Sequence, residues 1–165
     1  MALEIERKFL LKNLPNLDWD IVYNITQIYC NDKAGHGYRL RRRAVERPWW
    51  LYLKDLFTGE NKTEYFKTIK KKIKDGVYEE DETTITKEEY WKDYPQQLRI
   101  LNKIRYVKYV TDDLKWEVDD YGKLVIAEIE LADIDQTVDL FPIMSLLIKD
   151  VTDQPEFTNY RLAEH

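Results

Sequence analysis

Residues 2–11 (ALEIERKFLL) set apolar and charged side chains at alternating positions, which predicts a strand. In an extended strand, side chains two residues apart point to the same side. Ile5 and Phe9 would therefore lie on one face. Two carboxylates and an ammonium group would share the other face, at Glu4, Glu6 and Lys8. Such a charged face is typical either of a solvated strand or of one wall of a site that binds a cation and an anion.

Pairs of charged residues two positions apart recur in most of the later strand-like segments. The pairs are Arg39 and Arg41, Lys70 and Lys72, Glu80 and Glu82, Lys103 and Arg105, Glu117 and Asp119, and Glu128 and Glu130. Like charges on one face repel each other unless a group of opposite sign lies between them. Any single pair is explained if this face of an antiparallel sheet is exposed to solvent. A barrel with this face inward would instead require a ligand that carries both signs of charge.

The residue types in these pairs match two kinds of ligand. The Glu-x-Glu sequences near the start and near the end supply carboxylate oxygens, the hard ligands that Mg²⁺ or Mn²⁺ prefers. Arg-x-Arg and Lys-x-Arg supply forked and point-charge donors that suit phosphate oxygens. A divalent cation and a polyphosphate between an acidic and a basic wall would satisfy both sets.

The bulk composition predicts a single domain spanning residues 1–165 of a cytoplasmic protein. The chain is long enough to bury a substantial core, and its 35% charged and 13% aromatic residues argue against disorder. A net charge of −5 argues against a nucleic-acid grip spread over the whole surface. One cysteine and two histidines exclude an internal disulfide and Cys/His zinc motifs. Neither a membrane span nor a signal-peptide pattern is evident.

The hydrophobic periodicity predicts an antiparallel sheet of about eight strands that closes or nearly closes, with helices appended. The expected strands are 2–11, 27–30, 37–45, 49–56, 63–73, 78–85, 102–111, 114–122 and 124–132. The expected helices are 16–25, 87–94, 140–151 and 156–165. Thr86 and Glu89 form a candidate capping box before the second helix, which Pro95 would end or kink. Turns are expected at 57–62, 112–113 and 121–123.

Taken together, these motifs resemble the CYTH superfamily, the triphosphate tunnel metalloenzymes. The sequence EIERK at 4–8 fits the Glu-x-Glu-x-Lys signature that opens its members, and YFKTIK at 65–70 fits Tyr-x-x-Thr-x-Lys. Further matches follow in the same order: QIY at 27–29, RLR at 39–41, Glu80-x-Glu82, KIRY at 103–106, WEVD at 116–119, AEIEL at 127–131 and VTDQPEFTNYRLA at 151–163. The resemblance spans nearly the whole chain.

The resemblance implies an α+β fold, an eight-stranded antiparallel β-barrel that forms a tunnel with helices packed outside. The tunnel would take a triphosphate and require Mg²⁺ or Mn²⁺. By this resemblance the metal ligands are Glu4, Glu6, Glu128 and Glu130, with Asp119 or Glu117 contributing. The phosphate-binding residues are Lys8, Arg39, Arg41, Lys70, Lys103 and Arg105. Glu80 and Glu82 match a pair that orders the basic residues or assists water, and the C-terminal helix matches one that packs against a tunnel end.

Three stretches depart from the family pattern. Tyr78 lies in the region where members often carry an arginine, shortly before the Glu80-x-Glu82 pair. Residues 42–64 are longer than the simplest bacterial members need, and would add a hairpin or alter the tunnel mouth. The turn at 121–123 is shorter than in many relatives. These differences bear on which organic group, if any, fits on the triphosphate.

The preferred interpretation is a metal-dependent hydrolase that cleaves the terminal phosphate of tripolyphosphate, or of an organic or nucleoside triphosphate. One alternative is a class IV-type adenylate cyclase, which would make cyclic AMP and pyrophosphate. It would need an adenine pocket, for which Trp49–Trp50 is a candidate, although paired tryptophans in a strand more often pack. Another alternative is a non-catalytic module that binds triphosphorylated nucleotides or RNA 5′ ends. A small-molecule triphosphate is the expected partner, without membrane binding, and the expected state is a monomer or homodimer.

Overall fold

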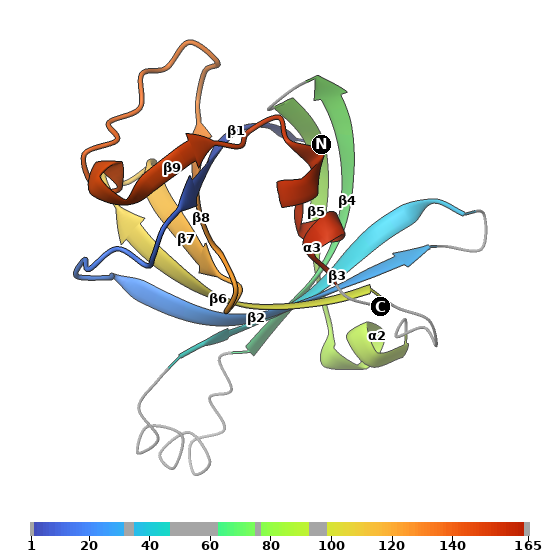
Figure 1. The fold of residues 1–165 in the computed structure, drawn as a ribbon. Helices are drawn as coiled ribbons and strands as arrows, with labels where there is room; N and C mark the ends of the chain where they lie inside the picture. Colours follow the sequence, from blue (N-terminus) through green and yellow to red (C-terminus); the bar gives the residue numbers. More distant parts are fainter. Residues whose placement is uncertain (1, 32–34, 47–62, 75–76, 93–98, 164–165) are drawn as a thin grey trace.

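The computed structural model describes residues 2–31, 35–46, 63–74, 77–92 and 99–163. They form one antiparallel sheet, most of which closes around a central axis (Figure 1). Its strands are β1 (Ala2–Leu11), β2 (Ile21–Asn31), β3 (Gly37–Val45), β4 (Thr63–Lys74), β5 (Val77–Ile85), β6 (Arg99–Tyr109), β7 (Lys115–Asp120), β8 (Val125–Leu131) and β9 (Leu147–Asp150). Eight of them close in the order β5-β4-β3-β2-β6-β7-β8-β1, with β1 pairing back to β5. The predicted eight-stranded barrel is confirmed.

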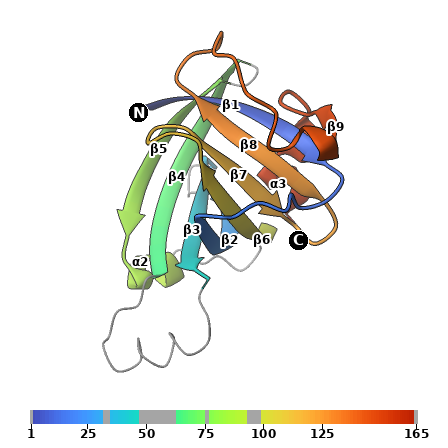
Figure 2. The same ribbon diagram turned by 90° about the vertical axis from the view of Figure 1, so that its left-hand side faces the viewer.

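Strand β1 completes the barrel and also carries the ninth strand. One edge of β1 pairs with β8, which sets Glu6 opposite Glu130 and Lys8 opposite Glu128. The other edge pairs with β5 near the start of β1 and with β9 near its end. β9 therefore lies beside the barrel wall and outside the ring of eight (Figure 1, Figure 2).

The outward face of β1, β7 and β8 is apolar and buried. Phe9, Trp116 and Ile129 are at most 2% exposed, and the rings of Phe9 and Trp116 lie 5.8 Å apart. The segment that follows β8 covers this face, because its Ile143 packs into the same cluster. Side chains alternate along a strand. Because the apolar residues of these strands pack on the outer face, the charged pairs between them point inward.

Helix α2 (Lys87–Lys92) covers the outer face of β2 and β3 in the same way. Its Tyr90 is 1% exposed and packs with Ile28 and Leu40. The predicted capping box opens this helix: the Thr86 N–H donates to Glu89 Oε2 at 2.7 Å, and the Glu89 N–H donates to Thr86 Oγ1 at 3.1 Å. Of the described helices, none is both long enough and apolar enough to span a membrane.

The predicted helix at 16–25 is wrong, because residues 21–31 form β2. The helical spacing of Ile21, Ile25 and Ile28 comes with several other β-branched residues, which favour strands. β2 pairs with β3 on one side and with β6 on the other. Pairing within the barrel therefore overrides the helical spacing.

The predicted helix at 140–151 is also wrong. A single 3-10 turn, η1 (Met144–Leu146), leads directly into β9. The backbone of β1 at residues 9–11 would otherwise leave hydrogen-bonding groups unpaired on this edge, and β9 supplies their partners. An apolar segment that reads as a packed helix therefore adds a strand instead.

The C-terminal helix is present but shorter than predicted: η2 (Pro155–Phe157) precedes α3 (Asn159–Leu162). The turn predicted at 121–123 joins β7 to β8, where Gly122 takes a φ of 81°, a conformation that glycine favours. The strand expected at 49–56, the turn at 57–62, Trp49–Trp50 and Pro95 lie outside the described residues, as does most of the long 42–64 segment.

Candidate functional site

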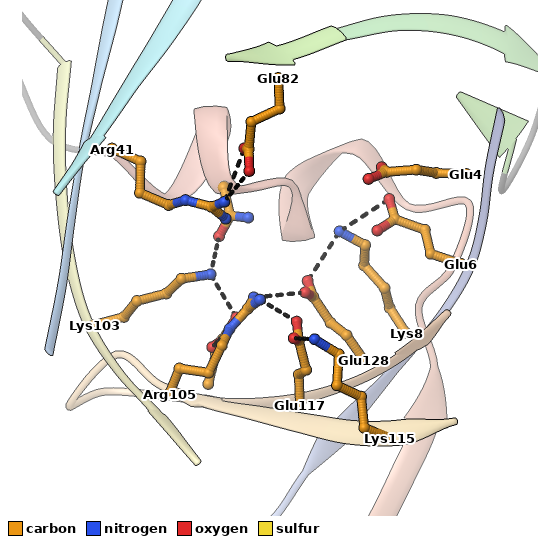
Figure 3. Close-up of polar contacts among 12 residues, drawn as sticks. Glu4, Glu6, Lys8, Arg41, Glu82, Lys103, Arg105, Lys115, Glu117 and Glu128 are labelled. Atoms are coloured by element: carbon orange, nitrogen blue, oxygen red, sulfur yellow. Dashed lines mark hydrogen bonds and ion pairs between the residues drawn. The ribbon is translucent and has the colours of Figure 1, made fainter. Parts of the chain in front are cut away.

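The inward side chains surround a cavity of about 410 Å³, here called the tunnel. Among the described residues, seven carboxylates line it: Glu4, Glu6, Glu80, Glu82, Glu117, Glu128 and Glu130. Seven basic side chains in the same part of the chain also line it: Lys8, Arg39, Arg41, Arg43, Lys70, Arg105 and Lys115. Figure 3 shows that acidic and basic groups of this lining face one another across the interior. Walls balanced in this way suit a ligand pair of both signs better than a free anion or a free cation.

Lys8 is enclosed between two carboxylates on the wall formed by β1 and β8. Its Nζ lies 3.0 Å from Glu128 Oε1 and 3.4 Å from Glu6 Oε1 (Figure 3). Burial opposes the ammonium charge, but Glu128 and Glu6 outweigh it and raise the pKa of Lys8. Burial also opposes ionisation of Glu128, and Lys8 leads the attractions that hold the pKa of that carboxyl well below its usual range. The pair is therefore charged at neutral pH.

Arg105 joins three carboxylates on neighbouring strands. Its Nε and Nη2 donate to the two oxygens of Asp119 at 2.7 Å each, and Nη2 donates to Glu128 Oε2 at 3.0 Å. Its Nη1 also donates to Glu117. Burial opposes the guanidinium charge, but these carboxylates, Asp119 first, raise the pKa of Arg105 well above its usual range. The guanidinium of Arg105 is thus charged at neutral pH and lies among the carboxylates of β7 and β8.

Lys103 (Figure 3) and Asp119 point inward from β6 and β7 but do not line the tunnel. Both side chains are 0% exposed, and Lys103 Nζ donates to Asp119 Oδ2 at 2.5 Å. Burial and the adjacent Arg105 lower the pKa of Lys103 to about 8, against the attraction of Asp119. Lys103 Nζ and the Tyr121 hydroxyl both donate to Asn159 Oδ1, at 3.2 and 2.7 Å, and so tie α3 to the barrel. In this geometry the Lys103–Asp119 pair positions Arg105 and α3.

Lys70 links the start of β1 to β5. Its Nζ donates to Glu4 Oε2 at 2.8 Å and to Glu6 Oε1 at 3.4 Å, and it lies 3.6 Å from Glu80 Oε2. The same ammonium group lies 4.4 Å from the centre of the Tyr78 ring. Burial raises the pKa of Glu80 against the attraction of nearby cations, and the carboxylate of Glu4 raises it further. Glu80 is thus the more basic member of a close carboxylate pair.

Two arginines of β3 hold buried donors without acceptors. Arg41 Nη2 donates to both oxygens of Glu82, at 2.7 and 2.8 Å (Figure 3). Arg39 Nη2 donates to Thr68, Glu80 and Glu82 at 3.1, 3.3 and 3.5 Å. The Nε atoms of both arginines are buried and have no hydrogen-bond partner among the described residues. Burial, followed by the guanidinium of Arg39, lowers the pKa of Arg41 to about 10. Buried donors without acceptors are costly, so an anion bound at these arginines would supply the acceptors.

Glu130 is an exposed member of the acidic tunnel lining. Its carboxylate has no hydrogen bond or ion pair with any described residue. Burial raises the pKa of Glu130, and the carboxylates of Glu4 and Glu117 raise it further. A divalent cation between these groups would remove the repulsion. As the side chains stand, no cluster of three acidic, cysteine or histidine groups in the described ranges is arranged to hold a metal, since Glu4 and Glu6 point at Lys70.

All predicted site residues except Lys103 and Asp119 line the tunnel. Among the lining residues outside the predicted set are two charged side chains, Arg43 and Lys115, and the amide of Asn159. Arg43 and Lys115 extend the period-two patterns of β3 and β7, so the sequence held a signal for both. Asn159 lies on α3, and only the packing of that helix against the barrel brings it to the site.

Solved structures of other proteins have the same fold. The crystal structure of the inorganic triphosphatase NE1496 matches with a TM-score of 0.55 and 21% identity, over 99% of this chain and 95% of that chain. A second NE1496 crystal structure matches with a TM-score of 0.53 and 22% identity, over 97% and 96%. The PH1819 protein from Pyrococcus horikoshii OT3 matches with a TM-score of 0.56 and 20% identity, over 84% and 82%. The fold is shared.

These matches agree with the tunnel barrel that the CYTH resemblance implies. No family model and no curated protein sequence matches the chain. At about one-fifth identity, the structural likeness establishes the fold, and the function has to follow from the chemistry of the tunnel.

Glu117→Gln is expected to lower the free energy of unfolding at neutral pH much more than in acid. Burial opposes ionisation of Glu117, but Arg105 and Lys115 hold its pKa at about 2, below the ordinary 4.5. A pKa that is lower in the folded state stabilises the fold above about pH 4.5, and this contribution is lost as the pH falls through 2. Urea unfolding should show a loss of about 3 kcal/mol at pH 7 and less than half of that loss at pH 3.

The matched control is Glu156→Gln, because Glu156 is exposed on η2, away from the tunnel. It should change the unfolding free energy little at either pH. An equal loss in Glu117→Gln at pH 7 and pH 3 would show that the ion pairs of Glu117 contribute nothing to stability.

Proposed function

We propose that this chain is a divalent-metal-dependent triphosphatase of the CYTH superfamily, which hydrolyses the terminal phosphate of a triphosphate bound in the tunnel. The observation that carries the proposal is the pair of buried Nε donors on Arg39 and Arg41, which have no acceptor among the described residues. In the same cavity, the carboxylates of Glu4 and Glu117 repel the exposed carboxylate of Glu130. A triphosphate would supply acceptors for the arginines, and a divalent cation would relieve the repulsion.

The arginines of β3 suit the phosphate chain. A guanidinium group binds phosphate oxygens through parallel N–H donors. Glu82 already orients Arg41 through two hydrogen bonds, so little side-chain entropy remains to be lost when phosphate binds. In an enclosed cavity, such preorganised donors stabilise the charge that spreads over the phosphoryl group during transfer.

The acidic wall fits Mg²⁺ or Mn²⁺. Glu4, Glu6 and Glu130 would hold the ion, because hard carboxylate oxygens are the donors that these cations prefer. A bound ion would neutralise phosphate oxygens and lower the pKa of an associated water. The balanced charge of the tunnel supports this pairing, since a triphosphate alone would leave the interior strongly negative.

The chain's own residues would bind the phosphates and accept a proton. The water oxygen bonds to the terminal phosphorus while the bond from that phosphorus to its bridging oxygen breaks, which yields orthophosphate and a diphosphate. Glu80 suits the acceptance of the water proton, because burial and Glu4 raise its pKa. The Nζ atom of Lys70 lies 3.6 Å from Glu80 Oε2. Lys70 would bind the phosphates and keep the Glu80 carboxylate close to them.

Turnover of three triphosphates tests the proposal. NE1496 is named as an inorganic triphosphatase, which makes tripolyphosphate the first substrate to try. The purified protein is incubated with tripolyphosphate, ATP or thiamine triphosphate, in Mg²⁺, in Mn²⁺ and in EDTA. We expect metal-dependent release of orthophosphate and the corresponding diphosphate. Cyclic AMP with pyrophosphate from ATP would identify a cyclase instead, and no turnover of any substrate would favour a binding module.

Arg41→Gln is expected to lower kcat/KM by roughly two orders of magnitude, because it removes a preorganised charge from the phosphate site. Arg42→Gln is the matched control, since Arg42 is the next residue and does not line the tunnel. Thermal melting establishes that both variants are folded. Comparable losses of kcat/KM in the two folded variants would refute the assignment of Arg41 to phosphate binding.

A further inference from the structure

Asn159, on α3, lies at the boundary between two cavities. A second cavity of about 520 Å³ adjoins the tunnel. Five described residues line both: Glu6, Lys8, Arg39, Lys70 and Asn159. Four of them are charged and come from barrel strands, whereas Asn159 is uncharged and comes from the C-terminal helix. Its amide therefore lies at the same boundary as three of the cations expected to bind phosphate.

Two donors determine which end of the Asn159 amide faces the barrel wall. Lys103 Nζ and the Tyr121 hydroxyl donate to Asn159 Oδ1, at 3.2 and 2.7 Å. An ammonium group has hydrogens to donate and no lone pair to accept one, so the carbonyl end of the amide must face Lys103. The NH2 end of the same amide is therefore directed away from this pair.

The amide nitrogen of Asn159 carries two hydrogens that no protein group accepts. Nδ2 makes no hydrogen bond with any described residue. Because Asn159 lines both cavities while its oxygen faces Lys103, Nδ2 presents these hydrogens to the space where the two cavities meet. An acceptor bound in that space would complete the hydrogen bonding of the amide.

Other contacts hold α3 against the barrel, so the amide is in place before a ligand binds. Arg99 Nη1 donates to the carbonyl oxygen of Tyr160 at 3.2 Å. The rings of Tyr29 and Tyr160 meet edge to face, with 5.4 Å between their centroids. A donor that is already positioned loses little conformational entropy when it binds.

We propose that Asn159 is a further phosphate-binding residue, whose Nδ2 donates to a phosphate oxygen of the triphosphate where the tunnel meets the second cavity. This inference rests on the proposed function and adds to its site a group from outside the barrel strands. A neutral amide binds a phosphate oxygen without changing the charge of the tunnel. A hydrogen bond to a charged group contributes roughly tenfold to hundredfold in affinity.

Asn159→Asp separates phosphate binding from a purely structural role. The aspartate oxygen can still accept from Lys103 and Tyr121, so α3 should stay docked and the melting temperature should not fall. The atom that faces the cavity changes from a donor to a carboxylate oxygen, which cannot donate to phosphate and repels it. We measure the affinity for tripolyphosphate by calorimetric titration in EDTA, and kcat/KM in Mg²⁺. Both are expected to fall about tenfold or more.

Asn31→Asp is the matched control, because Asn31 lines the second cavity and not the tunnel. It adds the same charge near the site and should stay close to the wild-type affinity. Asn159→Ala removes the amide without adding a charge, and should also lower the affinity about tenfold. Wild-type affinity in either Asn159 variant, or an equal loss in Asn159→Asp and Asn31→Asp, would overturn the inference.

Titration and turnover together keep this inference apart from the proposed function. If the wild type binds tripolyphosphate but hydrolyses no triphosphate, the proposed function fails, and the titrations still decide the role of Asn159. If tripolyphosphate is hydrolysed and both Asn159 variants keep the wild-type affinity and kcat/KM, the inference is overturned while the proposed function stands. A wild type that does not bind tripolyphosphate would overturn both.

Discussion

The outer face of the barrel is buried along β1, β7 and β8 and along β2 and β3, and this burial sets the direction of the charged pairs on those strands. On one side, the outward residues of β1, β7 and β8 pack beneath the segment that contains Ile143. On another, those of β2 and β3 pack beneath Tyr90 of α2. Strand alternation then turns the charged residues inward. Enclosed charges need compensation, and the described residues that line the tunnel accordingly include carboxylates and basic groups in equal number.

The charged groups inside the tunnel are not all equally well paired, and this difference points to a ligand. Lys8 with Glu128 and Arg105 with Asp119 form close pairs that serve as scaffold. Arg41 instead keeps a buried donor that no described residue accepts, and Glu130 is an exposed carboxylate that Glu4 and Glu117 repel. An anion would supply the missing acceptor, and a cation would relieve the repulsion.

The period-two charge pattern was enough to predict the barrel and most of the tunnel lining. It could not separate Glu117 from Asp119, which share a face of β7, because depth along the barrel decides which one reaches the cavity. The short side chain of Asp119 is enclosed by Lys103 and Arg105, whereas Glu117 lines the tunnel. Periodicity also failed where tertiary pairing overrides local preference, as in β2 and β9. Asn159 depends on the docking of α3, which leaves no periodic signal in the sequence.

The central claim is that a triphosphate and a divalent cation bind together in the tunnel, the phosphates at Arg39 and Arg41 and the cation at the acidic wall. Crystals grown with tripolyphosphate and Mn²⁺ test it directly, because anomalous scattering locates the metal independently of the phosphates. The account predicts a manganese peak bounded by Glu4, Glu6 and Glu130, with phosphate oxygens on Arg39 and Arg41. Phosphate bound outside the barrel, or manganese away from this acidic wall, would contradict it.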